Sequence, residues 1–153
     1  MIRSLIQRLA AAEVVVVGGV AAVAHGANYV TVDLDACYEG TDANRRRIVS
    51  ALGPLRPYPR GVDPGLPFAW DARTLRDTPF LTLTTSLGPV DLIPDVPGVG
   101  GYDAVRAQSV ALDVGGVAVR VLSLPALIDA KRAMDRPKDR ALLVELEALR
   151  ALE

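Results

Sequence analysis

The chain alternates between short apolar blocks and polar breaks, a pattern typical of a domain that mixes helices and strands. Leu5 and Leu9 lie about one helical turn apart and predict a helix near the N-terminus. The four valines at 14–17 predict a fully buried strand. The same patterns predict, in chain order, helix 2–12, strand 14–17, helix 20–25, strand 30–38, helix 42–52, a hairpin of strands 80–86 and 90–94, strand 117–122, a helix ending at residue 134, and helix 138–152. The expected fold class is α/β (α+β), with a mixed β-sheet flanked by helices.

Local signals mark the ends of several predicted elements. Thr41 and Ser123 each precede a segment with helical spacing and are expected to cap a helix. Gly26 suits the position that follows a helix end. Residues 54–67 hold five prolines and are expected to form an ordered loop or crossover, a kind of long loop that often serves function.

Composition narrows the class of protein. The 153 residues, 50% of them apolar, suit one domain, which we expect over residues 1–153. The formal net charge of −1 argues against a dedicated nucleic-acid-binding protein. A single cysteine, Cys37, excludes an intramolecular disulfide and fits a cytoplasmic location, and a single histidine, His25, excludes a His-rich metal site. No apolar run near the N-terminus approaches the ~20 residues of a membrane span, so no membrane partner is expected.

Carboxylates interrupt two of the predicted apolar strands. Asp33 and Asp35 lie two residues apart, so on a strand they would share one face. Like charges held that close raise one pKa unless a cation lies between them, and carboxylate oxygens suit Mg²⁺. Asp91 interrupts strand 90–94 in the same way, and its hairpin could bring it beside the pair to form a two-metal platform. The alternative is that Asp33 and Asp35 line a solvated face of the sheet.

The glycine pair Gly18-Gly19 separates the buried strand from the short helix. Glycine lets the backbone approach a ligand, and a helix N-terminus offers free N–H groups to a phosphate. Most isolated Gly-Gly pairs are simple turns. Here the order of strand, Gly-Gly, helix and Asp-x-Asp strand would place a phosphate cradle beside the metal platform.

This order resembles the nucleotidyltransferase superfamily, whose fold is that of DNA polymerase beta and the CCA-adding enzymes. The resemblance rests on VVVVGGVAAVAHGANYVTVDLDACY, with VDLIPDV supplying the third acid. It is closer to small bacterial nucleotidyltransferase-like proteins akin to those of abortive-infection and toxin–antitoxin systems, whose usual ending is similar to LSLPALIDAKRAMDRPKDRALLVELEAL. The match covers most of residues 14–149 and implies a minimal nucleotidyltransferase fold.

The resemblance also implies roles for individual residues. Gly18 and Gly19 would bind the triphosphate of an NTP through their backbone. Asp33 and Asp35 would hold two Mg²⁺ ions, and Asp91 would complete the second metal site and help activate the acceptor hydroxyl. The metals would offset the charge that develops on the attacking and leaving oxygens.

A lysine completes the implied site, and two positions depart from the family pattern. Lys131 lies where such proteins often keep a lysine and could meet a phosphate as a point charge, the alternative being an exposed helix lysine. Gly19 replaces the serine of the Gly-Ser branch, which removes a hydroxyl. Tyr29 stands where many relatives have an arginine, which removes a cation.

The other chemically interesting side chains favour structural roles. We expect His25 to make a hydrogen bond or cap its helix, and Cys37 to pack or line the site. Residues 45–47 are consecutive arginines that fan around a helix, which favours a solvated face over an RNA contact. The aromatic residues near the prolines are expected to anchor that loop in the core rather than stack on a base: Tyr58, Phe68 and Trp70.

Together these features predict a cytoplasmic, Mg²⁺-dependent nucleotidyltransferase that moves an NMP from an NTP to an acceptor hydroxyl on protein or RNA, in a toxin–antitoxin or phage-defence system. The acceptor would be held by a cognate partner protein, a homodimer or the proline-rich loop. The alternative is a catalytically weak or inactive antitoxin or regulatory binding protein with the same fold. The full set of acids favours the enzyme, whereas Tyr29 and the missing acceptor domain favour the alternative.

Overall fold

A mixed seven-stranded sheet forms the centre of the computed structural model, which describes residues 2–153. Its strands are arranged in the order β3-β4-β5-β2-β1-β9-β8. The pairs β1–β9 and β2–β5 are parallel and the others antiparallel. The strands span β1 (Val14–Val17), β2 (Leu34–Tyr38), β3 (Tyr58–Pro59), β4 (Leu81–Thr84), β5 (Val90–Ile93), β8 (Ser109–Val114) and β9 (Val117–Leu122).

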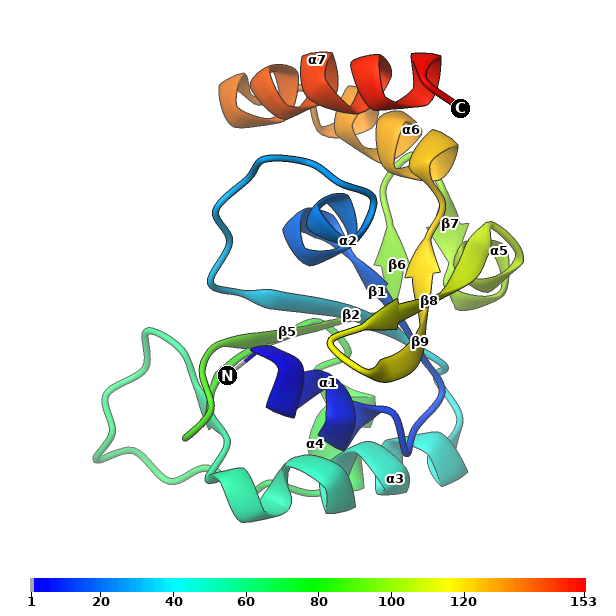
Figure 1. The fold of residues 1–153 in the computed structure, drawn as a ribbon. Coiled ribbons are helices and arrows are strands. Elements are labelled where there is room, and N and C mark those ends of the chain that lie inside the picture. Colours follow the sequence, from blue (N-terminus) through cyan, green and yellow to red (C-terminus); the bar gives the residue numbers. More distant parts are fainter. Residues whose placement is uncertain (1) are drawn as a thin grey trace.

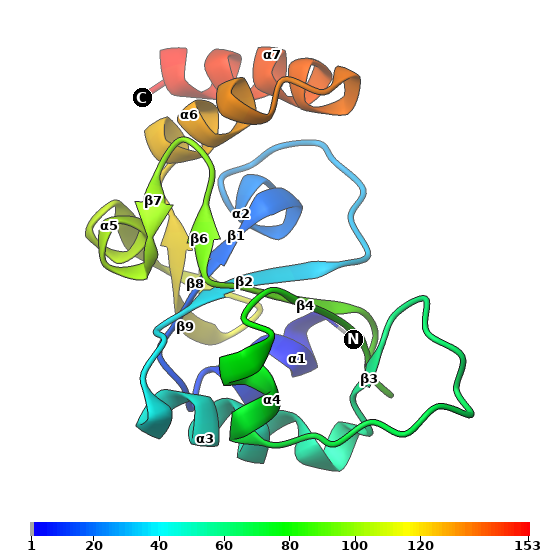
Figure 2. The same cartoon turned by 180° about the vertical axis from the view of Figure 1, so that it is seen from behind.

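Helices cover both faces of this sheet, which confirms the predicted α/β class (Figures 1 and 2). One side carries α2 (Gly18–Ala24), α6 (Leu124–Met134) and α7 (Pro137–Ala151). The other carries α1 (Ile2–Leu9), α3 (Asp42–Leu52) with its 3₁₀ turn η1 (Gly53–Leu55), and α4 (Ala72–Asp77). Next to the sheet lie a two-stranded ribbon, β6 (Asp95–Val96) and β7 (Gly100–Gly101), and α5 (Tyr102–Ala107). None of the helices in the described part of the chain has the length and apolar character needed to cross a bilayer.

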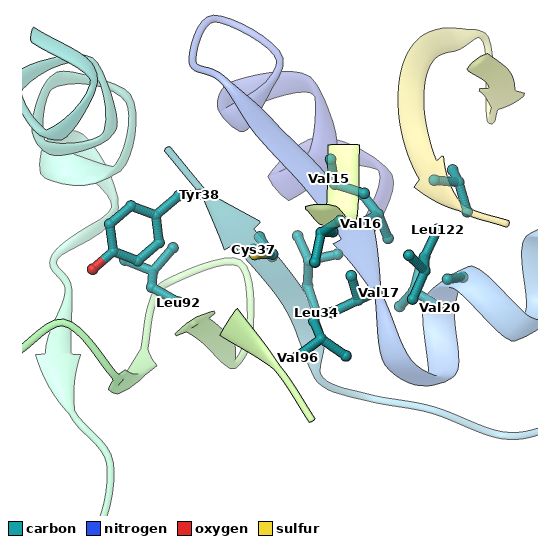
Figure 3. Packing of buried hydrophobic residues seen from close by; sticks show 14 of the residues in the cluster. Val15, Val16, Val17, Val20, Leu34, Cys37, Tyr38, Leu92, Val96 and Leu122 are labelled. Atoms are coloured by element: carbon teal, nitrogen blue, oxygen red, sulfur yellow. The ribbon is translucent and has the colours of Figure 1, made fainter. Parts of the chain in front are cut away.

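The valine strand is the middle of the apolar core, as its sequence predicts. Val15, Val16 and Val17 are each at most 3% exposed, and they pack among side chains from the neighbouring strands and from α2 (Figure 3). Leu34 and Leu122, from the strands on either side of β1, are fully buried. This burial is the main stabilising term for a strand that has no polar face.

Several predicted elements are confirmed with their caps. The Thr41 hydroxyl accepts a hydrogen bond from the Asn44 backbone N–H, and α3 spans the predicted residues. Ser123 caps α6 in the same way through the Ala126 N–H. The helix predicted over 2–12 ends at Leu9, and the glycine pair opens α2 rather than preceding it.

The strand predicted over 30–38 is shorter than its alternation suggests. Residues 30–33 lie outside β2, with Val30 89% and Val32 67% exposed, so Val32 does not share a buried face with Leu34. The cause is the length of the neighbouring strand. The register of β1 ends where Val17 faces Asp35, because the chain turns into α2 at the next residue. Without a partner strand, the alternating residues before Leu34 have no ladder to join.

Candidate active site

A cavity of about 350 Å³ lies between the sheet and the α6–α7 pair, and it gathers the residues that the sequence singles out. Gly18 and Gly19, the first residues of α2, line it together with Asp33, Asp35 and Asp91 on the sheet side. Lys131 of α6 lines the opposite wall. In Figure 1, α6 and α7 lie above α2 and the loop that leads to β2. All six predicted site residues therefore border one space.

Strand pairing brings Asp35 and Asp91 next to each other. They are direct partners in the parallel β2–β5 register. Asp33 lies just before β2 and reaches the cavity from the loop instead of from the strand, which corrects the prediction that it belongs to the strand. The hairpin of β4 and β5 is what places Asp91 there, as expected.

The environment of Asp35 favours its protonated form. Burial, the neighbouring charge of Asp91, a hydrogen bond to the Asp91 carboxylate and the charge of Asp33 together raise the pKa of Asp35 to about 7, although Lys131 opposes the shift. Burial is the largest cause of this shift and the adjacent acids add to it, and a cation between the carboxylates would oppose both. Hard oxygen donors in this state suit a divalent ion such as Mg²⁺.

Arg60 is a partner of the acids that sequence reasoning missed. It follows β3, and its Nη2 forms an ion pair with Asp91 Oδ1, while its Nη1 donates to the Leu83 carbonyl at 3.0 Å. The position lies in the proline-rich segment 54–67, where no periodicity points to a site. Within residues 2–153, no group of three or more His, Cys, Asp or Glu side chains stands in an arrangement that could hold a metal ion.

The glycine pair allows close contact between α2 and the acids. Gly18 has a φ of +65°, and a Cβ built on it would lie 2.2 Å from Asp35 Oδ2. A Cβ on Gly19 would lie 2.7 Å from the Tyr29 ring. Gly18 therefore requires glycine for its backbone conformation and its contact with Asp35, whereas a side chain at position 19 would have to displace the partly exposed ring of Tyr29.

Gly18→Ala is expected to lower the free energy of unfolding by about 2–3 kcal/mol, because a left-handed alanine costs about 1–2 kcal/mol and Asp35 must also move. Gly61→Ala is the matched control, since Gly61 has a φ of +80° but a Cβ added to it would have no atom within 4 Å. Urea denaturation of both variants measures the difference. Equal losses would show that Asp35 does not restrict Gly18.

A basic wall faces the acids across the cavity. Lys131, Arg136 and Lys138 line it from α6, the α6–α7 turn and α7. The buried Asp139, 1% exposed, binds two of them: its Oδ1 accepts from Lys131 Nζ at 3.2 Å, and its Oδ2 accepts from Arg136 Nε at 2.5 Å. Burial by itself would raise the pKa of Asp139, but the hydrogen bonds from Arg136 and Lys131 lower it to about 2.

The basic wall clarifies the role of one predicted residue, Lys131, and adds three residues that the sequence did not suggest. The Lys131 side chain is only 13% exposed, so it is not an exposed helix lysine. Sequence reasoning missed Arg136, Lys138 and Asp139. A Pro at the first turn of α7, with Asp139 two residues after it, is a helix-start signal that could have pointed to them.

The remaining candidates take structural positions. His25 Nε2 lies 2.8 Å from the Leu122 carbonyl and ties the end of α2 to β9. Cys37 is fully buried, and burial together with the charge of Asp95 raises its pKa to about 12, which leaves the thiol unreactive. Phe68 and Trp70 pack against the apolar core, as predicted for the loop, and the rings also contact one another, with centroids 5.7 Å apart for Tyr58–Phe68 and 6.4 Å apart for Phe68–Trp70.

Compared with models of known protein families and with curated proteins, the chain matches none of them.

Proposed function

We propose that this protein is an Mg²⁺-dependent nucleotidyltransferase, which moves an NMP from an NTP to an acceptor hydroxyl on protein or RNA. The observation that carries the proposal is that one cavity has an acidic wall and a basic wall. The acidic wall consists of Asp33, Asp35 and Asp91, and the basic wall is the one described above. A metal–nucleotide complex has the same division, because it presents divalent cations on one side and phosphate oxygens on the other. No three acids of residues 2–153 stand ready to hold an ion, so Asp33, Asp35 and the Asp91 oxygen that Arg60 leaves unpaired would have to close around Mg²⁺, while Lys131 and Arg136 would contact phosphate oxygens.

In the transfer step, the acceptor hydroxyl oxygen attacks the α-phosphorus. A new oxygen–phosphorus bond forms, and the bond from the α-phosphorus to the bridging β-phosphate oxygen breaks, so that pyrophosphate leaves with the electron pair. The hydroxyl proton would pass to a carboxylate that lines the cavity, and the resemblance to nucleotidyltransferases implies Asp91 in this role. Mg²⁺ held by the acids would supply positive charge to offset the charge that develops on the attacking and leaving oxygens.

The basic wall supports phosphate binding better than the glycine pair does. Helix α2 has only seven residues, and the ring of Tyr29 lies over Gly19. Lys131 and Arg136, in contrast, carry two positive charges held by one buried carboxylate, so the wall keeps a net positive charge. Backbone contacts from Gly18 and Gly19 to a triphosphate remain a prediction.

The test is incubation of the protein with α-labelled NTPs, Mg²⁺ and cell extract. Transfer of the label to a macromolecule is expected, with no transfer from γ-labelled NTPs, because only the nucleotidyl part is retained. The Asp33→Asn/Asp35→Asn double variant is expected to lose the transfer. Asp103→Asn/Asp113→Asn, which changes two exposed acids outside the cavity, is the matched control and is expected to keep it.

A second candidate is a binding protein that keeps the nucleotide pocket without transfer, in the manner of an antitoxin or regulatory module. The ion pair between Arg60 and Asp91 favours it, because one acid is already partly neutralised. NTP binding without label transfer would support this candidate. Absence of both metal and NTP binding at millimolar concentrations would contradict both.

A further inference from the structure

Arg60 is anchored over the β4–β5 pair at three points. Its backbone N–H donates to the Thr82 carbonyl at 2.9 Å, and its Nη1 donates to the Leu83 carbonyl at 3.0 Å. Its Nη2 forms the ion pair with Asp91 Oδ1. Thr82 is the register partner of Asp91, so the guanidinium is held beside the third acid by the sheet itself. Arg60 does not itself line the cavity, but the sheet holds its guanidinium against Asp91, which does.

The contact uses much of the capacity of Asp91 to bind cations. Its Oδ1 accepts from Arg60 Nη2, and Asp35 is its direct partner in the β2–β5 register. The side chains are shielded, with Asp91 18% and Arg60 32% exposed. Charge-assisted hydrogen bonds are strong, and salt screens partly buried charges less than exposed ones. A divalent ion bound to Asp91 would lie next to a guanidinium that cannot lose its charge.

We propose that Arg60 takes the place of one of the two cations that this kind of acidic site would hold, so that the nucleotide complex contains one divalent ion, bound by Asp33 and Asp35. The inference rests on the proposed function. The charges of the side chains support it: Asp33, Asp35 and Asp91, when ionised, carry three negative charges, which one guanidinium and one divalent ion balance, so the protein has no further unpaired carboxylate charge here for a second ion. Arg60 is then a positioning residue, which acts through Asp91.

The experiment measures how many Mn²⁺ ions bind to the protein when a nucleotide analogue is also bound. The four analogues are NTPs that carry a methylene group between the α- and β-phosphorus, and each is tested separately. Free Mn²⁺ is measured by electron paramagnetic resonance, so no turnover is needed. We expect one ion per nucleotide complex for the unaltered protein and two for Arg60→Met, which keeps the apolar stem but removes the charge. Arg60→Lys, which retains the charge, is expected to bind one.

Arg76→Met is the matched control, because Arg76 forms only an exposed ion pair with Asp77 outside the cavity, and it is expected to bind one ion. Two ions in the unaltered protein would overturn this inference and leave the proposed function intact, and this outcome does not depend on the folding of any variant. One ion in a folded Arg60→Met variant would also overturn it. Binding of neither Mn²⁺ nor any analogue would overturn the proposed function and this inference together.

Discussion

Asp35→Asn is expected to make the metal-free protein more stable at pH 8 and at the same time to remove divalent-ion binding. The reason is the raised pKa of Asp35, about 7 in the folded protein against 3.8 as its ordinary value. Between these pH values the folded state binds more protons than the unfolded state, so stability falls as pH rises through this window. Above pH 7 the full penalty applies, and asparagine removes it.

The size of the effect follows from the same shift. Each tenfold change in proton affinity corresponds to about 1.4 kcal/mol. Asp35 is only partly buried, and solvent screening reduces the expected gain at pH 8 to about 2 kcal/mol. Urea denaturation at pH 5 and pH 8 measures it: the unaltered protein should be less stable at pH 8, and the variant should change little. Asp103→Asn, in an exposed position of α5, is the control.

Mg²⁺ provides the second part of this test. Because a ligand that binds only the folded state stabilises it, Mg²⁺ with NTP should stabilise the unaltered protein and not Asp35→Asn. A variant that is less stable than the unaltered protein at pH 8 would contradict the assignment of Asp35 as a carboxyl group whose charged form is destabilised by burial and by the neighbouring acids. A gain in stability combined with a loss of ion binding is typical of a group retained for function rather than for folding.

Asp139→Ala is expected to have the opposite effect and to destabilise the fold by about 3 kcal/mol, because removing one partner of a buried ion pair leaves the others uncompensated. The carboxylate is 1% exposed and binds Lys131, the Arg136 side chain and the Arg136 backbone N–H at the start of α7. Its loss removes a helix cap and leaves Lys131, 13% exposed, without its counter-charge.

Thermal and urea denaturation at pH 7 measure this loss. Glu147→Ala is the matched control: Glu147 pairs with Arg132 on the exposed side of the same two helices and should contribute less than about 1 kcal/mol. Since the pKa of Asp139 is about 2, its contribution is present above pH 4 and is lost as pH falls toward 2. A loss no larger than that of Glu147→Ala would contradict the role of Asp139 as the centre of the basic wall.

The elements that the sequence predicts well are those whose signals are local. Helix α3 and the start of α6 are marked by Thr41 and Ser123, whose hydroxyl groups cap the helix a few residues away. The missed elements have weaker local patterns. Strand β8 lies at the edge of the sheet, and few of its side chains are apolar and buried, so its sequence gives a weak strand pattern. The glycines at 115 and 116 are the local signal for its hairpin with β9. Helix α4 is only six residues long, although Asp71 caps it.

The residues of the candidate site show the same difference between local and long-range signals. The spacing of Asp33 and Asp35, and the glycine pair before them, could be found in the sequence because each lies within one short segment. The residues that neutralise the acids and build the basic wall could not: Arg60 meets Asp91 across 31 positions, and Lys131 meets Asp139 between two helices.

The sequence by itself determined which acids interrupt apolar strands and that a buried valine strand and a glycine pair precede them. These features can be found in the sequence because periodicity and capping depend on residues a few positions apart. Only the tertiary structure decided that Asp35 stands beside Asp91, that Arg60 partly neutralises the pair, and that Lys131 and Arg136 face them. The physical reason is that the effect of a charge depends on distance and burial. Both are set by the pairing of strands and the packing of helices far apart in the chain.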